Sequence, residues 1–143
     1  MNSPDHRRLT SSIQHLAANG ADAAKVAEAI ASFWRDIEAA LAPVIGYRGV
    51  GALFERSLYL ARVAHPWLAA VPENIDARMD LAALTAVLQK QASSVAAAGG
   101  GAHLDALHEL LGSLIGPSLA ERLLRSTWSK PLAGSAAQDL PHD

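Results

Sequence analysis

The fold is decided by residues 20–46, which read GADAAKVAEAIASFWRDIEAALAPVIG. Asp22 places a negative charge where a helix N-terminus favours one, and Pro43 removes a backbone hydrogen bond that a helix would need. Along this stretch, apolar residues recur at alternating steps of four and three, which is the spacing of one face of an amphipathic helix. They are Val26, Ile30, Phe33, Ile37, Ala40 and Val44. We therefore predict a helix over residues 22–42.

The rest of the chain holds further apolar patterns with helical spacing. They predict helices over residues 50–64, 76–98, 104–115 and 117–128, with a short additional helix over 9–18. The glycines at 99–101 are expected to end the helix over 76–98, because each glycine in a helix interior costs about 1 kcal/mol. The sequence therefore predicts an all-α protein, an antiparallel four- or five-helix bundle over residues 10–128. A flexible N-terminus (1–9) and a flexible C-terminal tail (129–143) are expected to flank it.

One pattern occurs twice. Residues 40–46 read ALAPVIG and residues 110–116 read LLGSLIG, and an Arg-Ser pair follows each Ile-Gly after ten and nine residues. These pairs are Arg56-Ser57 and Arg125-Ser126. Two interpretations stay open: coincidence in a sequence rich in Ala and Leu, or two pseudo-symmetric helical hairpins.

Composition excludes several classes of function. The chain has 143 residues, of which 50% are hydrophobic and 18% charged, as expected for one folded domain. Its net charge of -2 gives no basic surface for nucleic acid. It has no cysteine, which excludes disulfides, thiolate catalysis and cysteine metal sites. No apolar run reaches the roughly 18 residues of a membrane helix, so we expect a cytoplasmic protein that binds no membrane.

Side chains that could carry chemistry do not form a recognisable set. His103 and His108 are five residues apart, so they lie about 140° apart on a helix rather than on one face. No H-E-x-x-H pair is present, and no serine lies in a G-x-S-x-G context. We therefore expect no catalytic residue, no metal ligand and no cofactor.

A short stretch around His108 resembles a known motif. Residues 106–112 read ALHELLG, which is similar to the motif of histidine-containing phosphotransfer domains. Those domains are four-helix bundles of similar size with an exposed phospho-accepting histidine, so the resemblance implies a phospho-acceptor at His108. The sequence departs from the motif at Leu111, where those domains carry the lysine that helps to neutralise the phosphoryl group.

The predicted helix over 50–64 has more apolar surface than one contact in a bundle can bury. Leu53 and Leu60 share one face, while Phe54 and Leu58 share another, about 100° away. Isologous dimers are the commonest assembly, so we expect a non-catalytic protein that acts through protein–protein interaction as a homodimer. The expected interface residues are Leu53, Tyr59, Leu60 and Trp67.

Two other classes of function stay open on the sequence. One is histidine phosphotransfer, or another signalling role, carried by His108. The other is a small-ligand-binding helical bundle with an apolar pocket between its helices. The residues expected to line that pocket are Phe33, Trp34, Phe54 and Tyr59.

Overall fold

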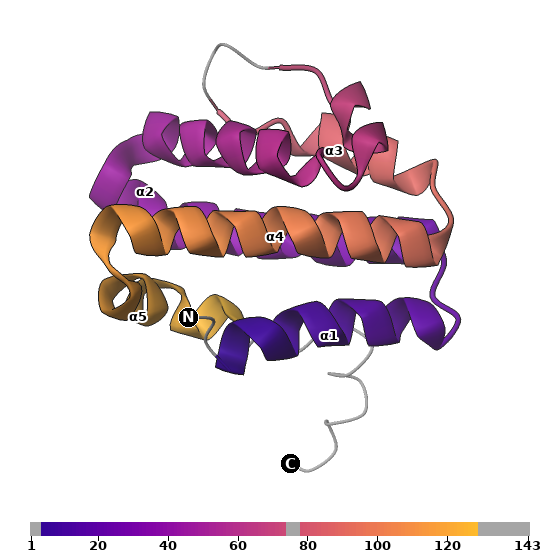
Figure 1. The fold of residues 1–143 in the computed structure, drawn as a ribbon, viewed down its shortest axis with the longest axis horizontal. Helices are drawn as coiled ribbons and strands as arrows, with labels where there is room; N and C mark the ends of the chain where they lie inside the picture. The colour runs from indigo at the N-terminus through magenta and orange to yellow at the C-terminus, as the bar shows by residue number, and fades with distance from the viewer. Residues whose placement is uncertain (1–3, 74–77, 129–143) are drawn as a thin grey trace.

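The computed structural model of the chain describes residues 4–73 and 78–128 (Figure 1). Within these ranges its regular secondary structure is entirely helical, with no strand, which confirms the prediction of an all-α protein. The elements are α1 (Pro4–Ala18), α2 (Ala23–Ala61), the short 3-10 helix η1 (Pro66–Ala70), α3 (Leu81–Gln89), α4 (Ser93–Ile115) and α5 (Pro117–Trp128). α1 begins at Pro4, ahead of the predicted start at residue 9. The predicted tail at 129–143 lies outside the described residues.

α4 is the central helix of the molecule. In Figure 1 it crosses the middle of the view, with α1 below it, α5 at the lower left and the later part of α2 above it. The earlier part of α2 lies behind α4, and α4 contacts α1, α2, α3 and α5. The other helices are therefore assembled around α4.

Aspartate side chains fix the start of two helices. The Asp22 carboxylate accepts a hydrogen bond of 2.9 Å from the backbone N–H of Lys25, at the start of α2. The Asp80 carboxylate accepts one of 3.0 Å from the backbone N–H of Ala83, at the start of α3. Each carboxylate satisfies an N–H group that has no partner within the helix. α2 therefore begins where the sequence predicts.

α2 changes direction at Gly46. This glycine has φ 79° and ψ 163°, a conformation that other residues rarely adopt. It divides α2 into a first segment, residues 23–45, and a second segment, residues 47–61. The first segment continues through Pro43, three residues beyond the predicted end at 42.

The same turn conformation occurs at Gly116, between α4 and α5. There φ is 92° and ψ is 145°, close to the values at Gly46. Each glycine follows an isoleucine, Ile45 or Ile115, and each is followed by another helix. The repeated Ile-Gly of the sequence therefore corresponds to one turn geometry that the chain uses twice.

The two segments of α2 run in opposite directions beside α4. Ile30 lies against Gly100 and Trp34 lies against His103, so residue numbers rise together along the first segment and α4. The turn at Gly46 sends the second segment back in the opposite direction (Figure 1). The antiparallel relation expected from the sequence thus describes the second segment against α4, whereas the first segment is parallel to α4.

The glycines at 99–101 lie inside α4, so the prediction that they end a helix is wrong. A Cβ atom on Gly99 would lie 2.3 Å from Cζ2 of Trp67, and one on Gly100 would lie 2.2 Å from Cδ1 of Ile30. Neighbouring side chains occupy the space that a Cβ would take. Close packing of Trp67 and Ile30 against the α4 backbone therefore offsets the poor helix propensity of glycine.

The helix boundaries on either side of these glycines change accordingly. The predicted helices over 76–98 and 104–115 are instead α3, which ends at Gln89, and α4, which begins at Ser93. Lys90, Gln91 and Ala92 form the connection. The break therefore falls about ten residues before the place that the glycines suggest.

Within the described residues, α2 is the one helix whose length and apolar composition would allow it to cross a membrane. The sequence prediction found no such segment. In the structure this helix contains the turn at Gly46 and buries Phe33 and Trp34 completely or nearly so among the other helices. In its most apolar stretch of 18 residues, 33% are buried within the molecule.

Candidate functional site

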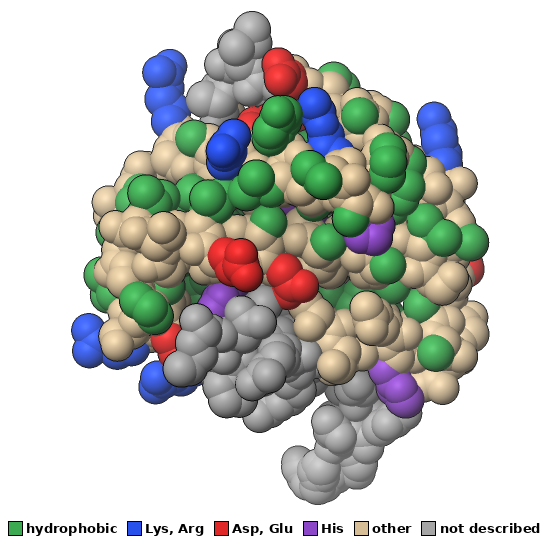
Figure 2. Space-filling view, in the orientation of Figure 1, with side chains coloured by type: hydrophobic (Ala, Val, Ile, Leu, Met, Phe, Trp, Pro, Cys, Tyr) green, Lys and Arg blue, Asp and Glu red, His purple; other side chains and the backbone are tan. Residues whose placement is uncertain are grey.

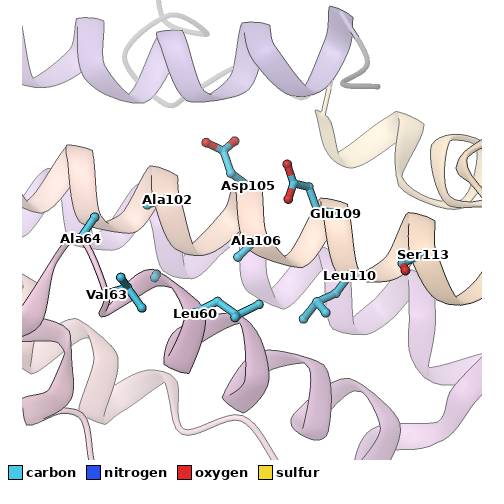
Figure 3. Close-up of a pocket in the computed structure, with 10 residues that line it drawn as sticks. Leu60, Val63, Ala64, Ala102, Asp105, Ala106, Glu109, Leu110 and Ser113 are labelled. Carbon is cyan, nitrogen blue, oxygen red and sulfur yellow. The ribbon is translucent and has the colours of Figure 1, made fainter.

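A groove runs between the second segment of α2 and α4 (Figure 3). Its volume is about 630 Å³. Leu60, Val63 and Ala64 line it at the end of α2 and in the turn that follows, and Ala102, Ala106 and Leu110 line it from α4. Most of its surface is apolar. The groove exists because α4 presents the small side chains of Ala102 and Ala106 one helical turn apart, which leaves the space between the helices unfilled.

Large apolar side chains stand exposed along the α2 side of the groove. The exposed fractions are 37% for Leu60, 51% for Tyr59 and 81% for Val63. Contiguous exposed apolar surface of this kind marks contact sites for proteins or ligands more often than scattered single residues do. The α2 side is therefore the strongest candidate contact surface in the described part of the chain.

Two arginines hold positive charge on the α2 side. The guanidinium carbon of Arg62 lies 4.9 Å from the centre of the Tyr59 ring, and that of Arg56 lies 5.5 Å from it. Both distances are within the range of cation–π attraction. The Tyr59 ring is thus flanked by two cations on the surface of α2.

The α4 side of the groove is acidic. Asp105 and Glu109 also line the groove, and their carboxylates point to the side of α4 that faces away from the second segment of α2 (Figure 3). Figure 2 shows the result on the surface: hydrophobic side chains gather in a band, with Lys or Arg side chains above it and two acidic groups below it. The groove therefore has a basic rim on α2 and an acidic rim on α4.

The expected interface residues lie in three places. Tyr59 and Leu60 lie together on the surface beside the groove. Leu53 is only 7% exposed and belongs to the core, so the two apolar faces of this helix do not both reach the surface. Trp67 is half-buried against Gly99, with its ring centre 6.3 Å from that of His65. It does not line the groove.

Sequence reasoning missed the α4 half of the groove. The sequence pattern that marks this half is a pair of alanines, Ala102 and Ala106, beside a pair of acidic residues, Asp105 and Glu109. The members of each pair are four residues apart. Such a spacing places small and acidic side chains on adjoining stripes of one helix. The sequence alone does not tell which helix approaches that stripe.

Three of the four residues expected to line an apolar pocket lie in the core. Phe33, Trp34 and Phe54 are at most 1% exposed, whereas Tyr59 is half exposed on the surface. The ring centres of Trp34 and Phe54 are 4.9 Å apart in an edge-to-face arrangement. These rings pack against each other as core side chains do, and the structure does not bring Tyr59 to them.

His103 completes this aromatic cluster. Its ring centre lies 4.5 Å from that of Trp34 and 4.8 Å from that of Phe54, and its side chain is fully buried. Its Nε2 lies 3.1 Å from the backbone carbonyl oxygen of Phe54, which accepts a hydrogen bond from it. Burial lowers the pKa of His103 to about 4, and the hydrogen bond to Phe54 opposes this shift only in part. His103 is therefore a neutral core residue at pH 7.

Two polar atoms of the cluster have no hydrogen-bond partner among the described residues. They are Nδ1 of His103 and Nε1 of Trp34, both buried. A buried polar atom without a partner is energetically unfavourable. The apolar packing of the cluster must therefore exceed this penalty.

His108 lies on the same helix and is only 7% exposed. Leu111, which stands at the position of the motif's lysine, is 1% exposed. A phospho-accepting histidine has to reach a partner protein from the surface, so this placement gives the phosphotransfer interpretation no support. Within residues 4–73 and 78–128, no group of three or more His, Asp or Glu side chains is arranged to hold a metal ion.

Comparison of the chain with protein-family models, with curated proteins and with solved structures finds no match.

Proposed function

We propose that this protein is non-catalytic and acts in the cytoplasm through protein–protein contact, as a homodimer. The observation that carries the proposal is the exposed apolar surface of Tyr59, Leu60 and Val63 beside the apolar groove. We call this surface, together with Ala102, Ala106 and Leu110 of α4, the groove face. Association would remove its side chains from water, and each large apolar side chain fully buried contributes roughly 1.5–3 kcal/mol.

The charge and composition of the chain support a protein as its partner. The net charge of -2 does not favour a nucleic acid, and the absence of cysteine is compatible with a reducing compartment. The groove face combines an apolar centre with charged rims, which is the usual organisation of a protein interface.

We also propose that the bundle is built from two units of one design. One unit is the first and second segments of α2, and the other is α4 followed by α5. The shared conformation of Gly46 and Gly116 supports this proposal. In each unit an Ile-Gly turn reverses or redirects a long helix into a shorter one.

The mass of the protein in solution tests the proposed homodimer. We expect light scattering to give the mass of two chains at micromolar concentration. Leu60→Glu places a charge in the groove face and is expected to weaken the dimer at least tenfold in Kd, which corresponds to about 1.4 kcal/mol.

Leu119→Glu is the matched control. Leu119 lies on α5 and is 38% exposed, against 37% for Leu60, but it does not line the groove. This variant should keep the wild-type mass, and circular dichroism should show the same helix content in all three proteins. A wild-type mass of one chain would contradict the proposal, and a dimer unaffected by Leu60→Glu would place the interface elsewhere.

A further inference from the structure

The two charged rims of the groove allow the arrangement of the dimer to be inferred. This inference rests on the homodimer proposed above. In Figure 3, Val63 and Ala64 lie beside Ala102, whereas Leu60 lies further along the groove, near Ala106 and Leu110. The second segment of α2 therefore runs antiparallel to α4 along the groove.

The spacing along the two helices places Arg56 and Glu109 towards the same end of the groove, on opposite sides of it. Arg56 is four residues before Leu60, so the two share one face of α2, with Arg56 one turn further towards the Leu110 end of the groove. Glu109 directly precedes Leu110 on α4 and lines the groove. Both side chains are exposed. The groove thus has an exposed positive group on its α2 side and an exposed negative group on its α4 side.

A homodimer with closed symmetry can cover this groove in two ways. If the twofold axis runs across the groove, each rim meets its own copy, so that Arg56 approaches Arg56 and Glu109 approaches Glu109. If the axis runs along the groove, each basic rim meets the acidic rim of the other chain. Like charges brought together at an interface are unfavourable, whereas complementary rims fix orientation and register.

We propose that two copies of this chain pair about a twofold axis that runs along the groove. The second segment of α2 in each copy then packs over α4 of the other copy, and Tyr59, Leu60 and Val63 cover the alanines of the opposite chain. Two Arg56–Glu109 ion pairs close the edges of this contact. The partner that fits the groove is therefore a second copy of the chain.

Charge reversal tests the direction of the axis. In Arg56→Glu homodimers two acidic rims would meet, and in Glu109→Arg homodimers two basic rims would meet. We expect each variant alone to dimerise at least tenfold more weakly than the wild type. An equimolar mixture of the two variants should form a heterodimer with a Kd close to that of the wild type, because its acidic copy meets its basic copy on both edges.

Two further variants make the test complete. The double variant Arg56→Glu/Glu109→Arg exchanges the rims within one chain and should dimerise by itself. Arg122→Glu reverses an exposed charge on α5, away from the groove, and should leave the Kd unchanged. Analytical ultracentrifugation gives the Kd values, and native mass spectrometry of differently tagged chains identifies the heterodimer.

The outcomes separate this inference from the proposed function. If the wild type dimerises but the mixed variants pair no better than each variant alone, the homodimer stands and the axis along the groove is wrong. If Arg56→Glu pairs more tightly with the wild type than either pairs with itself, the axis runs across the groove. A monomeric wild type would overturn both the homodimer and its arrangement.

Discussion

At the scale of single residues, the buried imidazole of His103 makes the stability of the fold depend on pH. It lies among the rings of Trp34 and Phe54, and its pKa is lowered from 6.5 to about 4 because burial disfavours the charged form. The unfolded chain therefore takes up a proton at a higher pH than the folded protein does. The stabilising effect of the neutral imidazole is complete above pH 6.5 and is lost as the pH falls from 6.5 through 4.

The substitution His103→Gln tests this linkage, since glutamine keeps a hydrogen-bond donor but does not titrate. Between pH 7 and pH 4, we expect the free energy of unfolding of the wild type to fall by roughly 3 kcal/mol more than that of the variant. Urea unfolding followed by circular dichroism at several pH values measures this difference, in which the contributions of the carboxylates cancel. Equal pH dependence in the two proteins would show that His103 titrates normally.

At the scale of helices, the sequence predicts where periodicity and caps act locally and fails where distant contacts decide. The apolar stripe and Asp22 predict the start of α2, because both act within one helix. The glycines at 99–101 mislead, because Trp67 and Ile30 fill the space beside Gly99 and Gly100 from about 30 and 70 residues away in the chain. No pattern within residues 93–115 carries that information.

In the groove, too, the sequence predicts what depends on one helix and not what depends on contacts between helices. Tyr59 and Leu60 could be predicted as surface residues, because the apolar surface of their helix is wider than one packing contact. The α4 side of the groove could not be predicted from the sequence. Ala102 and Ala106 line the groove only because the turn at Gly46 brings the second segment of α2 back beside them. Leu53 was predicted on the same reasoning as Leu60, but it is turned into the core.

Alanine substitutions at two of the α4 glycines should have opposite effects. A Cβ at Gly99 would lie 2.3 and 2.6 Å from atoms of the rigid Trp67 ring, whereas a Cβ at Gly101 would have its nearest neighbour at 3.9 Å, in Thr10. We expect Gly101→Ala to stabilise the protein by about 0.5–1 kcal/mol, because alanine favours the helix. We expect Gly99→Ala to destabilise it by about 1–2 kcal/mol, since displacing the ring outweighs that gain.

Urea denaturation midpoints of the two variants give this comparison directly. The two glycines lie two residues apart on one helix, so each variant serves as the control for the other. Stabilisation by Gly99→Ala would mean that Trp67 moves away freely and does not hold η1 against α4.

At the scale of the whole molecule, folding and association are expected to be linked. A ligand that binds only the folded state raises its stability, and in a homodimer the second chain is that ligand. The groove face lies on the two helices that meet around Phe54 and His103, so loss of these helices would also remove the interface.

The midpoint of thermal unfolding should therefore depend on protein concentration. We expect it to rise by roughly 2–5 °C for each tenfold increase in wild-type concentration. Leu60→Glu should show no such rise over the range in which it is monomeric. Scanning calorimetry or circular dichroism at three concentrations measures the effect, and a constant wild-type midpoint would argue against a dimer that dissociates on unfolding.

The consecutive glycines of α4, Gly99, Gly100 and Gly101, also bear on the order in which the chain folds. Together they destabilise an isolated helix by about 3 kcal/mol relative to three alanines. A peptide of residues 93–115 alone is therefore expected to have little helix content in water. Trp67 packs against Gly99 and Ile30 packs against Gly100, and both precede the glycines in the sequence. During synthesis, α2 and η1 leave the ribosome first and can already be structured when the glycines emerge. On this order, α4 forms late in folding, by packing against α2 and η1.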